Sequence, residues 1–207
     1  GSWGLETKDS STIPTGGLIA HYTFDNVVGG TVVDEQGNYN GTIYDLNTTT
    51  GHIGNGLLYS NNTAYMSLAG TIDFSNGFTY SAFIKRDSAS SSTFLCRSSA
   101  FKFNLLTGTA YEIQNLDGSD YQGAMSSTPS GFFHIVITIV GDTFKLYVDG
   151  VLEDTFVSNT PFPTHHSSNY PIGRPDYGNK APVDIDSLRI YNRELTQEEI
   201  TILSNEQ

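Results

Sequence analysis

Three strand-like segments follow one another in the second half of the chain, with only two residues between neighbours. The segments are "FFHIVITIV", "TFKLYV" and "VLEDTFV", and the links are Gly141-Asp142 and Asp149-Gly150. A two-residue link holds neighbouring strands antiparallel, and the Asp-Gly pair favours a type I′ turn because glycine accepts a positive φ. Residues 132–157 therefore predict a three-stranded antiparallel meander.

Similar apolar segments recur along the rest of the chain, divided by clusters of Gly, Asn, Asp and Ser. This pattern is typical of an antiparallel two-sheet sandwich, so the fold class that we expect is all-β, a jelly-roll sandwich. The further segments expected as strands are 17–24, 62–68, 78–85, 92–97, 101–106, 110–116 and 185–191.

One helix is predicted, at the C-terminal end of the chain. Thr196 is placed as its N-cap and Glu199 as its third residue, and together they form a capping box. Leu195 before the cap and Ile200 after it form a hydrophobic staple. We expect this short helix to pack across the rim of the sandwich.

Size and charge narrow the class of protein. The 207 residues suit one buried domain, which we expect over residues 16–207, with residues 1–15 a cloning remnant and linker. The formal net charge of −12 and the pI near 4.5 argue against nucleic acid and anionic membrane surfaces as partners. Since no apolar run reaches transmembrane length, no membrane insertion is expected. The single cysteine, Cys96, excludes an internal disulfide and leaves the compartment open.

Paired catalytic carboxylates are not evident in the strand-like segments. Enzymes that cleave glycans place two carboxylates in one cleft, roughly 5–10 Å apart, and on a single strand this calls for acids at alternate positions. Asp184 and Asp186 are the only matched pair, since Glu153 and Asp154 are adjacent and point to opposite faces. The sequence therefore predicts a protein that is not an enzyme.

The stretch "VDIDSLRIY" holds those two acids in an unexpected place. Strict alternation puts Asp184 and Asp186 on the same face as Leu188, where a charge needs a partner. Salt bridges to Arg189 or Lys180 are one answer. A metal ion is the other.

Calcium suits such a site because it takes carboxylate and backbone oxygens from several segments. Asp25 and Asn26 end the first strand-like segment just before a Gly-rich loop. The first and last strands of a sandwich are often neighbours, because chain termini tend to lie close together. Asp25, Asn26, Asp184 and Asp186 are therefore the candidate metal ligands, and a structural calcium is the expected cofactor.

Five stretches together resemble a known family. "GLIAHYTFDN", "GHIGNGLLYSNNTAYMSL", "FTYSAFIKRD", "FFHIVITIVGDTFKLYVDGVLE" and "IDSLRIYNRELTQEEI" occur in the order seen in laminin G-like, concanavalin A-like lectin/glucanase jelly-roll domains of bacteria and phages. The resemblance spans about residues 17–203, and its last stretch is the most specific. It implies a calcium ion between Asp25 and Asp186. Four positions depart from the family pattern, namely Phe132, where Trp is usual, Val183, where Gly is usual, Asp184, where an uncharged residue is common, and Ser187, where an acid is usual.

The resemblance also implies binding of glycans, cell-surface polymers or protein partners, as in adhesins, carbohydrate-active enzymes and phage tail fibres. The loop of residues 158–182 offers aromatic faces for sugar rings beside planar polar groups, and the alternative is that its tyrosines pack the loop onto the sandwich. The candidate ligand-binding residues are Tyr170, Arg174, Asp176, Tyr177, His165 and Asn179.

Three functions from different classes follow. The first is a non-catalytic carbohydrate-binding or adhesion module of a larger extracellular, cell-surface or virion protein, with cell-surface glycans and the other domains of that protein as partners. The second is a ligand-free structural or protein-interaction domain. The third is a polysaccharide-cleaving enzyme, against which the missing carboxylate pair argues.

Overall fold

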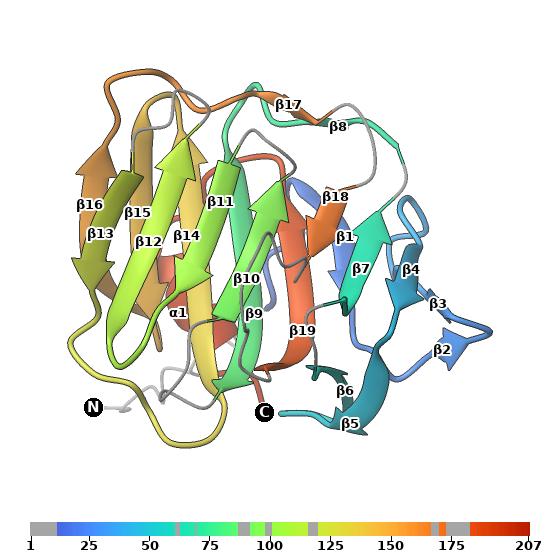
Figure 1. Cartoon of the computed structure of the whole chain (residues 1–207). Coiled ribbons are helices and arrows are strands. Elements are labelled where there is room, and N and C mark those ends of the chain that lie inside the picture. Colours follow the sequence, from blue (N-terminus) through green and yellow to red (C-terminus); the bar gives the residue numbers. More distant parts are fainter. Residues whose placement is uncertain are drawn as a thin grey trace, which may run out of the picture.

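The fold is a sandwich of two antiparallel sheets, as the strand pattern predicts (Figure 1). The computed structural model describes residues 12–60, 63–68, 70–86, 92–97, 101–115, 120–166, 170–172 and 183–207. Two large sheets lie face to face in this part of the chain, and the one helix described is at its C-terminal end. The expected fold class, an all-β jelly-roll sandwich with a short C-terminal helix, is confirmed.

The strand order defines the two layers. The eight-stranded sheet runs β16 (Val151–Val157), β15 (Thr143–Val148), β14 (Phe133–Val140), β9 (Phe78–Arg86), β19 (Val183–Tyr191), β6 (Asn55–Tyr59), β5 (Asn47–Thr50), and β1 (Leu18–Tyr22) also pairs with β19. The nine-stranded sheet runs β13 (Asp120–Ala124), β12 (Ala110–Asn115), β11 (Phe101–Leu105), β10 (Ser92–Arg97), β18 (Tyr170–Ile172), β7 (Tyr65–Leu68), β4 (Gly41–Tyr44), β3 (Thr31–Val32), β2 (Val27–Val28). A small sheet pairs β8 (Ile72–Asp73) with β17 (His165–His166), and the helix α1 covers Gln197–Ser204.

The predicted meander is present. Strands β14, β15 and β16 pair antiparallel in sequence order. Asp149 and Gly150 both have a positive φ, 47° and 80°, as a type I′ turn requires. The sequence pattern misses the short strands β2 to β6, because strands of two to five residues offer too few positions for alternation to be recognised.

Strand β19 lies inside the eight-stranded sheet and contains a bulge. Its register to β9 shifts between Asp186 and Arg189, and Ser187 has a left-handed φ of 48°. The bulge inverts the alternation, so that Ile185 before it and Leu188 after it both belong to the core between the sheets. The side chains of Asp184 and Asp186, which precede the bulge, therefore point away from the core. The prediction that the acids of β19 share a face with Leu188 is wrong for this reason.

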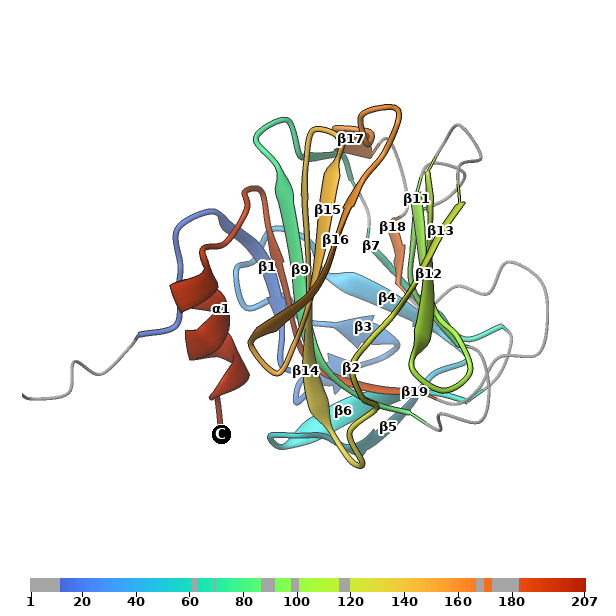
Figure 2. The ribbon, with the colours of Figure 1, turned by 90° about the vertical axis from the view of Figure 1, so that its left-hand side faces the viewer.

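The helix α1 packs on the outer face of the eight-stranded sheet (Figure 2). Its capping box is confirmed, since the Thr196 hydroxyl accepts from the Glu199 N–H and the Glu199 carboxylate accepts from the Thr196 N–H. Ile200 packs in one cluster with Tyr191, which lies beyond the bulge. The expected position across the rim is wrong, because the apolar side chains on this outer face require a cover.

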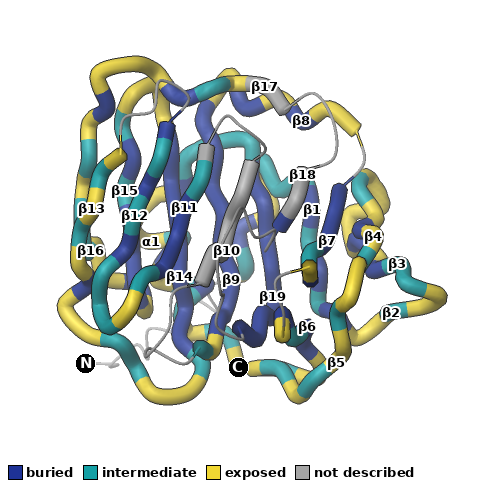
Figure 3. The backbone as a smooth tube through the Cα atoms, viewed as in Figure 1, coloured by how far each residue is buried: buried dark blue, intermediate teal, exposed yellow. Residues whose placement is uncertain are grey.

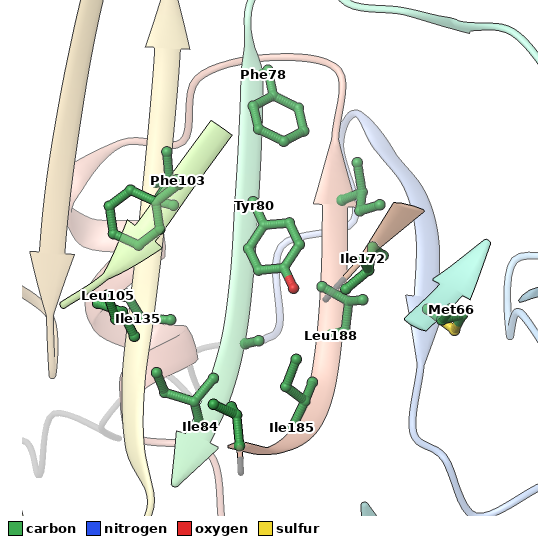
Figure 4. Packing of buried hydrophobic residues seen from close by; sticks show 14 of the residues in the cluster. Met66, Phe78, Tyr80, Ile84, Phe103, Leu105, Ile135, Ile172, Ile185 and Leu188 are labelled. Carbon is green, nitrogen blue, oxygen red and sulfur yellow. The ribbon is translucent and has the colours of Figure 1, made fainter. Parts of the chain in front are cut away.

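The core lies between the two sheets (Figure 3). Tyr80 and Leu188 of the eight-stranded sheet belong to the same buried cluster as Met66, Phe103 and Ile172 of the nine-stranded sheet (Figure 4).

Within the described residues, no helix has the length and apolar composition needed to cross a membrane.

Candidate functional site

Asp25 and Asp186 lie against the same loop, residues 51–54, which joins β5 to β6. The Ile53 N–H donates to Asp186 Oδ2, and the Asn55 N–H donates to Asp25 Oδ1, both at 2.8 Å. Asp186 Oδ1 also accepts from the N–H of Ser187 at 2.5 Å. Asp186 is fully buried beneath this loop, outside the core between the sheets, and Asp25 is exposed.

Burial of Asp186 sets the electrostatics of this cluster. Burial raises the pKa of Asp186 above its ordinary value, whereas hydrogen bonds from the backbone of Ile53, Ser187 and His52 lower it. The negative charge of Asp25 raises the pKa of Asp186 further, so the two carboxylates repel each other. A cation between them would convert this repulsion into attraction.

Two glycines of the loop leave room for these carboxylates. A Cβ on Gly51 would lie 2.6 Å from Asp186 Oδ2, and a Cβ on Gly54 would lie 2.4 Å from Asp25 Oδ1. Among the described residues, no group of three or more His, Cys, Asp or Glu side chains is placed to hold a metal ion. A calcium ion would therefore take its remaining oxygens from the backbone or from water, and the carboxylates of Asp25 and Asp186 are the kind of ligand that calcium prefers.

The other two predicted metal ligands make different contacts. Asp184 Oδ2 forms an ion pair with Lys85 Nζ at 2.8 Å. The backbone carbonyl of Asn26 accepts from the N–H of Val33 at 3.2 Å, which closes the hairpin of β2 and β3. The structure thus brings Asp25 and Asp186 to one loop, while Asp184 is held at Lys85.

The predicted ion-pair partner Arg189 does not neutralise the acids of β19. Its two terminal nitrogens contact the carboxylate of Glu206, each at 2.6 Å, and its side chain is almost fully buried. The prediction for Arg189 is therefore wrong, and Lys85 takes this role for Asp184. Lys180, the other predicted partner, lies outside the described residues.

Most of the predicted ligand-binding residues cannot be placed. Arg174, Asp176, Tyr177 and Asn179 lie outside the described residues. The backbone of Tyr170 lies in β18 opposite Leu68, within the nine-stranded sheet. The backbone of His165 lies in β17 opposite Asp73 of β8. These two positions therefore belong to different sheets.

The outer face of the nine-stranded sheet carries a row of amide and carboxylate side chains that the sequence pattern does not reveal. Glu112 of β12 accepts from Asn104 of β11 at 2.9 Å and from Gln122 of β13 at 3.2 Å. Next to this group, Gln114 donates to Asp120 at 2.6 Å. The row runs across three strands, so a search for acids along one strand misses it. The signal that could have found it is the alternation of β12, where Glu112 and Gln114 lie between buried neighbours.

Two tyrosines lie on the same outer face, toward its other edge. Tyr44 of β4 is opposite Tyr65 of β7, and their rings stack with centroids 4.4 Å apart. Tyr44 is 44% exposed, although large aromatic side chains are generally buried. The face therefore combines aromatic rings with planar polar groups, and both kinds of side chain are used to bind sugars.

A serine–histidine pair elsewhere in the sandwich is not accessible to a substrate. Ser81 Oγ lies 2.8 Å from His134 Nε2, and both residues are buried. Burial lowers the pKa of His134 to about 3, with the positive charge of Arg189 and the neighbouring His52 acting in the same direction. The pair therefore serves the packing of β9 against β14.

A shallow depression of about 310 Å³ lies beside the start of α1, near β15. Lys145 and Glu194 form an ion pair at 2.9 Å within its lining. The remaining lining residues are Tyr147, Leu195, Thr196 and Gln197. Because the two charged groups of this depression neutralise each other, it offers no unpaired charge to a ligand.

Solved structures with the same fold include carbohydrate-binding domains. Domain 4 of AbnA, a GH43 extracellular arabinanase from Geobacillus stearothermophilus solved in complex with arabinotriose, is 22% identical with a TM-score of 0.71, over 91% of this chain and 98% of that one. The ligand-binding domain of botulinum neurotoxin serotype D, in complex with N-acetylneuraminic acid, is 16% identical with a TM-score of 0.69 over 91% of this chain. The binding domain of Paraclostridial Mosquitocidal Protein 1 is 17% identical with a TM-score of 0.71, also over 91% of this chain. This chain spans about half of each toxin domain.

The family follows from the sequence comparison. A search of curated proteins found no match. The model of the concanavalin A-like lectin/glucanases superfamily matches residues 60–201, more than half of the chain, including the meander and the strand–helix end that resemble this family. The chain therefore belongs to the concanavalin A-like lectin/glucanases superfamily.

Proposed function

We propose that the protein is a non-catalytic glycan-binding module of a larger extracellular, cell-surface or phage tail protein, and that it recognises cell-surface glycans. The observation that carries this proposal is the outer face of the nine-stranded sheet. Helix α1 covers the corresponding face of the other sheet, whereas no described helix or strand covers this one (Figure 2). Tyrosine rings and a row of hydrogen-bonded amides and carboxylates lie on it, with Tyr44, Asp120 and Gln122 exposed.

The chemistry of this face suits a sugar. Sugar rings present apolar C–H faces and a rim of hydroxyl groups, which require an aromatic surface beside oriented donors and acceptors. Glu112 is fixed by two amide donors and Gln114 is tied to Asp120, so these groups are held in place before a ligand arrives. The glycan complexes of the arabinanase domain and of the neurotoxin domain support the same class of ligand.

A non-catalytic role is supported by the same contacts. A general acid and a second carboxylate must both be available to the scissile bond of a glycan. Both oxygens of Glu112 accept from side-chain amides, and Asp120 accepts from Gln114. The enzyme alternative predicts that the protein releases reducing ends from a polysaccharide, and an assay over arabinan, xylan and glucan would detect that release.

A structural calcium belongs to this proposal. Asp25 and Asp186 would hold the ion together with backbone or water oxygens at the loop of residues 51–54. A bound calcium would supply positive charge between two carboxylates that otherwise repel each other. The role that we assign to it is to link the first strand, the loop and β19.

One observation favours a second function, a protein-interaction domain. Strand β16 is an edge of the eight-stranded sheet, and the exposed fractions of Val151, Leu152 and Val157 are 62%, 46% and 58%. An exposed apolar edge strand can pair with another chain. This function predicts association with another domain or copy and no glycan binding.

A glycan array separates the two functions. The protein is applied with calcium to an array of neutral and sialylated oligosaccharides, and to bacterial and animal cells before and after glycosidase treatment. Saturable binding that the glycosidases abolish is the expected result. Absence of binding on the array and on cells, together with concentration-dependent self-association, would instead establish the protein-interaction domain.

A further inference from the structure

The stacked tyrosines occupy a defined place on the outer face of the nine-stranded sheet. Their strand neighbours Ile43 and Met66 pack with the core, so Tyr44 and Tyr65 point away from it. The two ring planes are 14° apart, which places the rings face to face across the two strands. Tyr65 on β7 covers one face of the Tyr44 ring, and the other face is directed toward β3, the strand on the opposite side of β4.

The free face of Tyr44 lies beside a turn without side chains. The register Thr31 to Thr42 continues into the turn of the hairpin of β2 and β3, where the N–H of Ile43 donates to the carbonyl of Gly30 at 2.9 Å. This register places Gly29 opposite Tyr44. A Cβ added to Gly29 or Gly30 would meet no atom within 4 Å, so the space above the turn is open.

Glycine is required at that turn for a backbone reason as well. Gly29 and Gly30 have φ values of 58° and 81°, the pair of positive values of a type I′ turn. The tight turn thus keeps the space beside the Tyr44 ring free of side chains. An exposed ring, backed by a second ring and facing open space, is a ready surface for the C–H face of a sugar.

Hydrogen-bonding groups flank the ring. Asp45 directly follows Tyr44, and its Oδ2 accepts from the hydroxyl of Thr63 at 2.6 Å. Asp45 has a left-handed φ of 52°, a conformation that costs energy for a residue with a side chain. Thr42 lies two residues before Tyr44 on the same face and is exposed. A carboxylate and hydroxyl groups therefore lie near Tyr44 along β4 and at its end, and sugar hydroxyls require such groups.

The charge of the surrounding sequence selects between classes of sugar. All four strands of this region come from residues 27–68, and residues 12–84 contain no Lys or Arg. The acids in this range are Asp25, Asp34, Glu35, Asp45 and Asp73. A sialylated or otherwise anionic sugar would be repelled here, whereas a neutral sugar meets no such penalty.

We propose that Tyr44, backed by Tyr65 and flanked by Asp45, is the stacking site for a neutral sugar ring of a glycan. This inference rests on the proposed glycan-binding function and names the site and the class of sugar. A ligand stacked on Tyr44 would lie over β4 and β7, toward the β2 end of the sheet. The amide and carboxylate row of β11 to β13 lies at the other end of the same sheet.

Substitution of Tyr44 tests the site. Tyr44→Thr removes the ring and keeps a residue that favours strands, and Tyr44→Phe keeps the ring without its hydroxyl. Val140→Ala, at a residue of similar exposure in β14 of the other sheet, is the matched control. Each variant is compared with the wild type on an array of neutral oligosaccharides that includes arabinotriose, beside sialylated oligosaccharides, with far-UV circular dichroism and melting curves to verify folding.

The expected result is that wild type, Tyr44→Phe and Val140→Ala bind neutral glycans alike, and that Tyr44→Thr binds about tenfold more weakly or worse. In wild-type protein the ring protons of Tyr44 should shift in NMR spectra on addition of the neutral glycan, a readout that no variant can disturb by misfolding. Equal neutral-glycan binding by Tyr44→Thr, or Tyr44-dependent binding of sialylated sugars alone, would overturn the inference and leave the proposed function intact. A wild-type protein that binds no glycan would overturn both.

Discussion

Ser187 decides which face of β19 each acid occupies. Its left-handed backbone inserts one residue into the strand, and the alternation of side chains changes at that point. Without the bulge, Asp184, Asp186 and Leu188 would lie on the same face of β19. Burial of Leu188 in the core would then bury the two acids there as well. With it, Asp184 reaches Lys85 and Asp186 reaches the loop of residues 51–54. One residue thus separates a set of acids from the apolar cluster that the same strand builds.

His134 gives a prediction on pH. Burial lowers its pKa to about 3, below the value near 6.5 of an unfolded histidine, so below pH 6.5 protons bind preferentially to the unfolded state. The stability that His134 contributes is therefore present above pH 6.5 and is lost as the pH falls toward 3. Between pH 7 and pH 5 the loss from this residue is about 2 kcal/mol.

The measurement is urea unfolding at pH 7 and pH 5 for the wild type and His134→Gln. The variant should lose about 2 kcal/mol less than the wild type over this interval. Burial also lowers the pKa of His21, to about 4. The stability that the protein loses through His21 is the same in the wild type and the variant, so the difference between them reports on His134. Equal losses in the two proteins would show that folded His134 takes up its proton in the ordinary pH range.

At the scale of elements, the helix α1 depends on its cap. Thr196 and Glu199 satisfy each other's backbone N–H groups, and Glu199 also pairs with Arg193 at 2.6 Å. Thr196→Ala should lower the free energy of unfolding by about 1 kcal/mol, because one of these N–H groups loses its acceptor. Thr196→Ser keeps the hydroxyl and should retain nearly all of the stability. Chemical denaturation measures both, and an unchanged midpoint for Thr196→Ala would contradict the role of the cap.

Hydrogen bonds to one carboxylate join the edges of the two sheets. Asp154 of β16 accepts from the hydroxyls of Tyr111 and Tyr121, at 2.6 and 2.9 Å, and these tyrosines belong to the nine-stranded sheet. Burial and the Asp154 carboxylate hold the pKa of Tyr111 well above its usual range, so its hydroxyl remains a donor. Hydrogen bonds to a charged group stabilise more than neutral ones do.

Asp154→Ala should therefore cost about 2 kcal/mol of stability, since two hydroxyls lose a charged acceptor. The neighbouring Glu153→Ala removes contacts to the exposed Ser126 and should cost less than about 1 kcal/mol. The two variants are compared by thermal and urea unfolding. Equal effects would mean that Asp154 does not link the sheets.

Elements whose partners lie close in sequence could be predicted, and contacts between distant strands could not. The Asp149-Gly150 turn and the capping box of Thr196 need only their immediate neighbours. By contrast, Lys85 and Asp184 are 99 residues apart, and only the pairing of β9 with β19 brings them together. The group around Glu112 likewise depends on the order of three strands.

The same distinction between local patterns and contacts of distant segments holds for the candidate site. The pairing of a first-strand acid with an acid of the closing strand was suggested by the order of strands and by the family resemblance. The N–H groups of Ile53 and Asn55 donate to the two acids. These residues belong to a stretch that resembles the family, but nothing in the sequence places them beside Asp25 and Asp186. The stacking of Tyr44 on Tyr65 could not be foreseen because β4 has only four residues and its alternation is too short to be recognised.

At the scale of the whole molecule, the proposed calcium would tie together three segments that are distant in sequence. Asp25 follows β1, residues 51–54 join β5 to β6, and Asp186 lies in β19. An ion that binds only the folded state, at a free concentration about 100 times its Kd, adds about 2.7 kcal/mol of stability. For a domain of this size that corresponds to a rise in Tm of roughly 5–10 °C.

Melting curves in EDTA, and after calcium is restored, should therefore differ by about 5–10 °C for the wild type. Asp186→Asn should abolish this difference, because it removes a charged ligand at the centre of the site. Asp142→Asn, in the exposed hairpin turn between β14 and β15, is the control and should leave the difference unchanged. Asp184→Asn should also keep the calcium response, since Asp184 is paired with Lys85. A wild-type Tm that is the same in EDTA and in calcium would mean that hydrogen bonds from the protein, those of the Ile53, Ser187 and His52 backbone among them, stabilise the buried carboxylate of Asp186 without an ion.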